Sequence, residues 1–87
     1  MAHHLSAKKR IRQNQKQRAR NRQYRTHMRS RIKKLNDLIT AGKKEEATAL
    51  LPGTVATIQK LGSKNIIHKN QVRRRVSRVV RAVTRMP

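Results

Sequence analysis

The side chains of this chain that are capable of chemistry are almost all lysines and arginines, and the chemistry they offer is phosphate binding. Residues 8–25 include nine of them and no acid, and Ile11, Ala19 and Tyr24 are the only apolar side chains there. A guanidinium group donates paired hydrogen bonds to phosphate oxygens and also stacks on bases. Because such a segment cannot form a protein core, its charge predicts a polyanionic partner, most simply nucleic acid.

No arrangement of residues predicts catalysis or metal binding. Asp37, Glu45 and Glu46 have no histidine partner, the serines have no base arranged near them, and there is no glycine-rich phosphate loop. His3 and His4 are adjacent near the N-terminus but lack further ligands for a metal. We therefore expect no enzyme activity, no cofactor and no metal site.

The composition predicts one small domain, residues 1–87, with a thin core. The chain has a formal net charge of +21, and only 34% of its residues are hydrophobic. Residues 1–34 and 63–87 contain thirteen and eight basic residues and no acid, whereas residues 35–62 balance three bases with three acids. Cysteine, a secretory signal and an apolar run of about 18 residues are all missing. These features favour a soluble, cytoplasmic protein in which a neutral packing element joins two cationic surfaces.

The basic segment is expected to be the first half of one long helix, from an N-cap at Ser6 to about Ala41, with Gly42 ending it. At about 100° per residue, its cations fall nearly all the way round the axis. From Tyr24 onward an apolar stripe appears, so the second half should dock while the first half projects and is disordered in the free protein. The stripe comprises Tyr24, Met28, Ile32, Leu35 and Ile39, with Leu38 at its margin.

Two further helices complete the expected fold. The second, from about Lys43 to Leu61, keeps one apolar phase across Pro52 and should be a single kinked helix. The third, from about Lys69 to Arg85, has an apolar face and an arginine ridge on opposite sides. Short connections between three such stripes predict an all-α three-helix bundle with an extended, projecting N-terminal basic helix. The second stripe comprises Ala47, Leu50, Leu51, Val55, Ile58 and Leu61; the third comprises Val72, Val76, Val79, Val80, Val83 and Met86, opposite Arg74, Arg78, Arg81 and Arg85; and Ile66 and Ile67 should plug the end of the core.

The mode of binding is expected to be recognition of the backbone and shape of a folded, double-helical RNA. Tyr24 is the only aromatic residue and lies on a packing stripe, which disfavours base stacking on aromatic rings. The interleaved amides either contact riboses and base edges or are simply tolerated on a helix surface, and His68 either caps the third helix or contacts a phosphate. The candidate RNA-binding residues are Lys8, Lys9, Arg10, Arg12, Gln13, Asn14, Lys16, Arg18, Arg20, Asn21, Arg22, Arg25, Arg29, Lys33, His68, Lys69, Asn70, Arg74, Arg75, Ser77, Arg78 and Arg81.

An ordered set of motifs over nearly the whole chain resembles the bacterial small-subunit ribosomal protein family bS20. The motifs are Ser6-Ala7-Lys8-Lys9-Arg10, Ile11-Arg12-Gln13-Asn14, Arg20-Asn21, Ile32-Lys33-Lys34, Gly42, Ile67-His68-Lys69-Asn70, Arg74-Arg75 and Ser77-Arg78. The resemblance implies a three-helix bundle with an extended first helix that binds the small-subunit (16S) ribosomal RNA early and joins RNA segments. It also implies few or no protein partners and no homo-oligomer. His3-His4, Pro52-Gly53 and Val76 depart from the family pattern.

Three other classes of protein share part of this pattern. A leucine zipper needs a seam of several heptads, whereas Gly42 ends this one after little more than two. A membrane-active basic peptide needs interfacial aromatic residues, and Tyr24 is the only candidate. A histone-like DNA compactor matches on charge alone, so the choice between RNA and DNA depends on a binding comparison.

Overall fold

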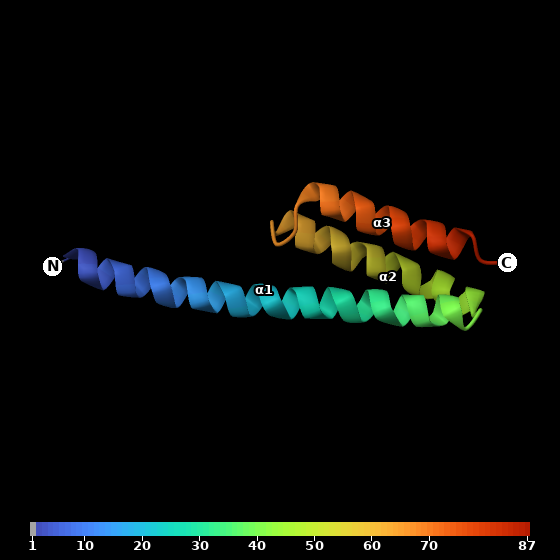
Figure 1. Ribbon diagram of the computed structural model, residues 1–87, viewed down its shortest axis with the longest axis horizontal. Coiled ribbons are helices and arrows are strands. Elements are labelled where there is room, and N and C mark those ends of the chain that lie inside the picture. Colours follow the sequence, from blue (N-terminus) through green and yellow to red (C-terminus); the bar gives the residue numbers. More distant parts are fainter. Residues whose placement is uncertain (1) are drawn as a thin grey trace.

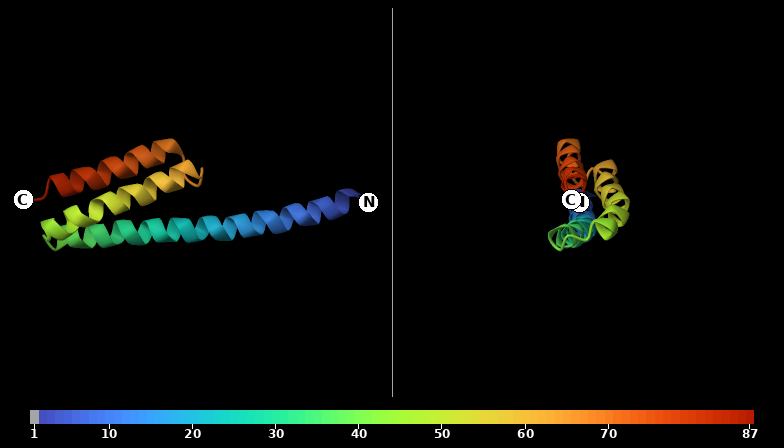
Figure 2. Two further views of the ribbon diagram at one scale, coloured as in Figure 1. Left: turned by 180° about the vertical axis from the view of Figure 1, so that it is seen from behind. Right: turned by 90° about the vertical axis from the view of Figure 1, so that its right-hand side faces the viewer.

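The chain folds into three helices, two of which lie along one half of the first. The computed structural model describes the backbone of residues 2–87 and the side chains from residue 6 onward, so Met1 and the side chains of His3 and His4 lie outside it. Its helices are α1 (Ala2–Thr40), α2 (Lys44–Ser63) and α3 (Lys69–Thr84). Figure 1 and Figure 2 show α2 and α3 beside the C-terminal half of α1, while the N-terminal half extends alone. The predicted all-α bundle with a projecting first helix is therefore confirmed.

The molecule is far from spherical because of this projection. Its principal extents are 66 × 21 × 15 Å and its radius of gyration is 17.6 Å. A compact chain of this length would have a radius of gyration of about 12 Å. Side chains 6–20 are all exposed, and we refer to residues 2–20 as the arm.

The two ends of α1 differ in how well the sequence predicted them. The predicted start at Ser6 is wrong, because α1 is already helical at Ala2 and continues without a break. The predicted disorder before Tyr24 in the free protein stays a prediction, because it concerns the stability of this helix without RNA. Residues 2–5 contain neither glycine nor proline to stop the helix.

The predicted end of α1 at Gly42 is confirmed. Gly42 has a φ of +74°, and its N–H donates to the carbonyl of Ile39 while the Lys43 N–H donates to that of Leu38, both at 3.0 Å. These two bonds form a Schellman motif, in which a left-handed residue closes the last turn.

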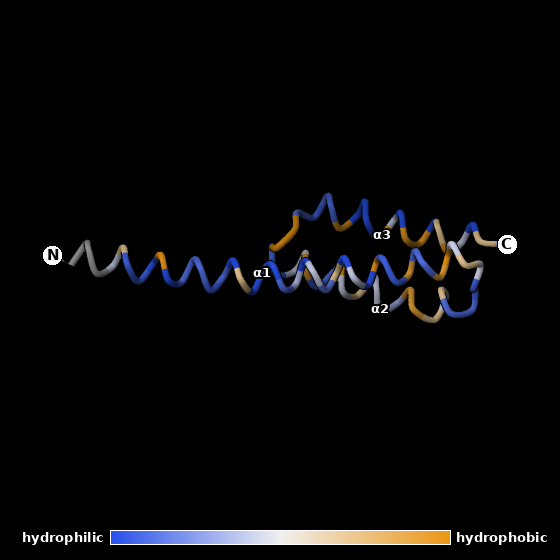
Figure 3. Tube along the Cα trace, turned by 60° about the horizontal axis from the view of Figure 1, so that its bottom comes forward, coloured by the Kyte–Doolittle hydropathy of each residue, from blue (hydrophilic) through white to orange (hydrophobic). Residues whose placement is uncertain are grey.

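The three predicted stripes meet to form the core. Helix α2 packs against both α1 and α3, whereas α1 and α3 contact each other less extensively. In Figure 3 the hydrophobic residues gather where the helices lie together, and the arm is almost entirely hydrophilic. The buried hydrophobic residues are Met28, Leu35, Ala47, Ile58, Leu61, Ile66, Val79, Val83 and Met86.

Two residues differ from the predicted core. Val80 is 38% exposed, because it lies about 80° from Val72 around the helix and therefore at the edge of the stripe. Thr54 is fully buried although it is polar. Its hydroxyl donates to the carbonyl of Leu50 at 3.1 Å, which removes the penalty of burying an unpaired polar group.

Helix α2 runs through Pro52 without interruption, as its single apolar phase predicted. Proline has no N–H, so the carbonyl four residues earlier loses its usual partner. The threonine hydroxyls near Pro52 donate to other carbonyls of the helix, as Thr57 does to that of Gly53 at 2.9 Å. We therefore attribute the continuity of the helix to packing of the apolar stripe on both sides of the proline.

The turn between α2 and α3 brings the chain back over the end of the core. Asn65 adopts a left-handed φ of 58°, and the Ile66 N–H donates to the carbonyl of Leu61 at 3.0 Å. His68 is the N-cap of α3, where its Nδ1 accepts a hydrogen bond from the Asn70 N–H at 3.1 Å. Capping, one of the two alternatives for His68, is therefore confirmed.

Amide hydrogen exchange should separate the arm from the bundle in the free protein. Each turn of the arm is held only by its own backbone bonds, and Lys8, Arg12, Lys16 and Arg20 place like charges four residues apart. We expect amides of residues 8–20 to exchange at least about tenfold faster than those of residues 28–39. Equal protection of both segments without RNA would contradict this assignment.

A side chain added at Gly62 should lower the stability of the protein unless the side chain of Val72 is also shortened. A Cβ at Gly62 would lie 2.5 Å from Cγ2 of Val72, so Gly62→Ala should destabilise the free protein by about 1 kcal/mol despite the better helix propensity of alanine. In a Val72→Ala background the same substitution should become neutral or stabilising. Urea unfolding followed by helical circular dichroism measures both differences, and an unchanged effect in the two backgrounds would contradict the close contact.

Candidate nucleic-acid interface

The arm presents cationic side chains in every direction. Its predicted RNA-binding residues are all exposed, and only Arg20, at its end, lines a hollow together with a residue of another helix. The amides among them are exposed as well, so they are available to donate and accept hydrogen bonds. These residues are Lys8, Lys9, Arg10, Arg12, Gln13, Asn14, Lys16, Arg18 and Arg20.

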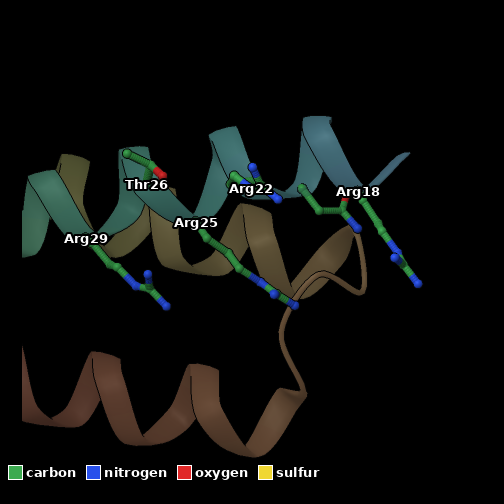
Figure 4. A pocket seen from close by; sticks show the side chains of 6 residues that line it. Arg18, Arg22, Arg25, Thr26 and Arg29 are labelled. Carbon is green, nitrogen blue, oxygen red and sulfur yellow. The ribbon is translucent and has the colours of Figure 1, made fainter. Parts of the chain in front are cut away.

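Four arginines form a row on α1 where the arm joins the bundle. Arg18, Arg22, Arg25 and Arg29 follow a spacing of four, three and four residues, which places them within about 40° of one direction around the helix. Together with Asn21 and Thr26 they line one hollow. In Figure 4, Arg18, Arg25 and Arg29 extend from α1 toward the side on which the α2–α3 turn and α3 lie.

The same side of α1 continues into a groove shared with α3. Ile32 and Asn36 of α1 and Arg75, Arg78, Val79 and Ala82 of α3 line it. No acidic residue lines either hollow. We call the two together the arginine groove, because its polar walls are dominated by guanidinium groups and its floor is partly apolar.

Arg25 differs from the other arginines of the row because it has a protein partner. Its Nη2 donates to the carbonyl of Ile66 at 2.9 Å, across 41 residues of sequence. This bond fixes the α2–α3 turn against α1 and so sets one end of the arginine groove. A guanidinium group has five N–H donors, so the bond leaves others available to a ligand.

A second cationic cluster lies beside Tyr24. The hollow there is lined by Arg20, Gln23, Tyr24, His27 and Lys60. The Nζ atoms of Lys60 and Lys64 lie 5.8 and 5.3 Å from the centre of the Tyr24 ring.

Sequence reasoning missed Lys60 and Lys64. Lys60 belongs to the segment whose charges cancel, and Lys64 falls in the turn after α2. Their spacing of four residues, at the end of the helix that packs on Tyr24, was the available signal.

The predicted residues of α3 divide into an exposed and a half-buried group. Arg74, Arg78 and Arg81 are exposed, as the ridge prediction requires, whereas Arg75 and Ser77 are half-buried. The structure therefore distributes the predicted residues over the arm, the arginine groove and the α3 ridge instead of one patch. The predicted residues at the start of α3, His68, Lys69 and Asn70, are exposed, and so is Lys33 on α1.

Other kinds of site receive no support within the part of the chain that the structure describes. No group of three or more potential metal ligands comes together among these residues. None of the described helices is long and apolar enough to cross a membrane.

The fold and these surfaces define a small all-α protein with a thin core and extensive cationic surfaces. Comparison with known proteins gives the family. Residues 2–84 match the family model described as Ribosomal protein S20, and the chain belongs to this family, as the sequence motifs indicated.

Curated relatives extend over nearly the whole chain. The "Small ribosomal subunit protein bS20" of Desulfatibacillum aliphaticivorans is 42% identical over 83 residues, which cover 95% of this chain and 94% of the relative. The protein of the same name from Desulfotalea psychrophila is 41% identical over 83 residues, covering 95% and 93%. That of Anaeromyxobacter dehalogenans is 42% identical over 85 residues, covering 98% and 92%.

Replacing Arg25 should affect folding, whereas replacing Arg22 should not. Arg25→Gln removes the bond to the Ile66 carbonyl and should lower the free energy of unfolding of the free protein by about 1 kcal/mol. Arg22→Gln, at an exposed position, should change it by less than about 0.5 kcal/mol. Urea unfolding of both variants measures the difference. Equal free energies of unfolding of Arg25→Gln and Arg22→Gln would contradict a structural role for Arg25.

Proposed function

We propose that this protein is a structural constituent of the small ribosomal subunit that binds the 16S ribosomal RNA directly and bridges segments of it. The observation that carries the proposal is the arginine groove, which consists of two hollows along one side of α1. One is lined by arginines of α1 and the other by arginines of α3, and no acid lines either. The family and the names of the relatives support ribosomal RNA of the small subunit as the polyanion that this site binds. Lysine and arginine contacts to phosphates hold the RNA in place and help it to fold.

The arginine groove fits a phosphodiester backbone better than an isolated base. Guanidinium groups at regular spacing along a helix pair with successive phosphates, and the fork of each donates two hydrogen bonds. Ile32, Val79 and Ala82 on the floor offer contacts to sugars, which carry the apolar part of the backbone. Such contacts recognise the shape of a folded RNA and carry little sequence information.

The arm gives the protein reach beyond the bundle. Its nineteen helical residues extend about 28 Å, which is more than the width of an RNA double helix. Because its charge surrounds the axis, the arm contacts phosphates on more than one side when it lies between RNA segments. The arm and the arginine groove thus bind separate segments, which is how a monomer without protein partners bridges them.

The acidic residues favour one orientation on the RNA. Asp37, Glu45 and Glu46 all lie near the α1–α2 turn, at the end of the bundle opposite the arm in Figure 1. The charges around this turn cancel, because Lys34, Lys43 and Lys44 lie beside the acids, so phosphates are attracted to the arm, the groove and the ridge instead. The α1–α2 turn therefore points away from the RNA.

Salt and competitor nucleic acids test this function. If about eight to ten phosphates are contacted, affinity for refolded small-subunit ribosomal RNA should fall by about three to five orders of magnitude between 50 and 200 mM salt. At equal salt the protein should bind this RNA more tightly than a duplex DNA of similar charge. A flat salt response would contradict phosphate-dominated binding, and equal affinity for DNA would instead support a general nucleic-acid compactor.

Charge-matched variants separate the groove from the total charge. Arg22→Gln/Arg29→Gln removes two positive charges from the groove, and Lys34→Gln/Lys43→Gln removes two from positions that each have an acid three residues later. The groove variant should reduce the slope of log affinity against log salt by about two and the control by clearly less. Equal effects would mean that the arginine groove has no special role.

A further inference from the structure

The cluster beside Tyr24 has the composition of an anion-binding site. Lys60 and Lys64 both place their ammonium groups within 6 Å of one aromatic ring, at 5.8 and 5.3 Å. Arg20 and His27 line the adjoining hollow, and no acid does. The ring attracts both ammonium groups through cation–π interaction, but each contributes only about 0.5–1 kcal/mol at an exposed position. Two like charges on one ring therefore still lack a full counter-charge.

The cluster is held in place by the fold. Tyr24 is half-buried against the core at the point where α1 leaves the bundle. Lys60 lies in the last turns of α2, and Lys64 is its C-cap residue. A partly buried ring and two lysines on adjacent turns fix the spacing of the charges, whereas the cations of residues 8–16 line no hollow with α2 or α3.

The cluster lies on the side of α1 opposite the row of groove arginines. Around the helix axis, Arg20, Gln23 and His27 lie roughly 140–200° from Arg18. Along the axis the two sites overlap, since one includes residues 18–29 of α1 and the other residues 20–27. A strand bound in the arginine groove cannot also neutralise Lys60 and Lys64.

We propose that Lys60, Lys64 and Arg20 form a second phosphate site, which binds a different RNA backbone from the one in the arginine groove. This inference rests on the proposed function and specifies where the bridging occurs. At residues 18–29, α1 separates two RNA backbones by the thickness of one helix, about 10–12 Å with side chains. Tyr24 does not stack on a base here; it positions two ammonium groups for phosphate oxygens.

Tyrosine fluorescence gives a readout specific to this site, because Tyr24 is the only aromatic residue of the chain. Titration with inorganic tripolyphosphate, which does not absorb in this range, should change the emission in a saturable manner. Lys60→Gln/Lys64→Gln should weaken this response at least about fivefold, whereas Arg22→Gln/Arg29→Gln and Lys34→Gln/Lys43→Gln should retain it. No emission change in the wild type, or equal responses in all three variants, would overturn the second site.

Binding to ribosomal RNA distinguishes failure of this inference from failure of the proposed function. Lys60→Gln/Lys64→Gln should weaken binding to refolded small-subunit ribosomal RNA about tenfold or more and reduce the salt slope by about two. If the wild type binds this RNA in preference to duplex DNA but Lys60→Gln/Lys64→Gln behaves like Lys34→Gln/Lys43→Gln, the second site is wrong and the function stands. If the wild type shows no such preference, the function itself is wrong. Circular dichroism of each variant checks that the helices are intact.

Discussion

The packing of one apolar stripe of α1 against α2 is the interaction on which the rest of the structure depends. Only the part of α1 from Tyr24 onward contributes to the core, and α3 reaches that core mainly through α2. With a net charge of +21 in 87 residues, mutual repulsion opposes every increase in compactness. A single thin core that leaves all the cations outside is the arrangement that this composition permits, and it leaves half of the longest helix without a partner.

The position of the core also decides which cationic surfaces are preformed. Where α1 has neighbours, its arginines lie beside α3 and the α2–α3 turn. The 2.9 Å hydrogen bond from Arg25 to the carbonyl of Ile66 fixes that turn against α1. Where α1 has none, the charges of the arm depend on local helix stability alone. In the proposed function, an RNA backbone that enters the arginine groove meets an already ordered site, whereas the arm gains its main stabilisation from the RNA itself. In this function the arginine groove contributes affinity and the arm contributes reach.

Much of the fold could be predicted from the sequence because its signals are periodic. The stripes beginning at Tyr24, Ala47 and Val72 identified the three helices, and Gly42 marked the end of the first. The start of α1 could not be predicted, because Ser6 is equally acceptable as a cap and as an exposed helical residue. Val80 was misplaced because the angular pattern gives no sharp edge to a stripe. The arginine groove and the Tyr24 cluster escaped the sequence analysis for a different reason: each combines residues from helices whose relative placement depends on packing.

The basic segment, residues 8–25, therefore contributes to two different surfaces, the arginine groove and the cluster beside Tyr24. Considered alone, residues 8–25 have cations in nearly every direction and no preferred face. Once α2 and α3 are in place, the directions cease to be equivalent at residues 18–29, because α3 and the α2–α3 turn border one side and the end of α2 borders another. The row from Arg18 to Arg29 then becomes one wall of a groove, while Arg20 joins the lysines over Tyr24. A helix with charge on one side only would supply a single surface, so the proposed binding of two RNA backbones, one on either side, depends on the absence of an uncharged face in this segment.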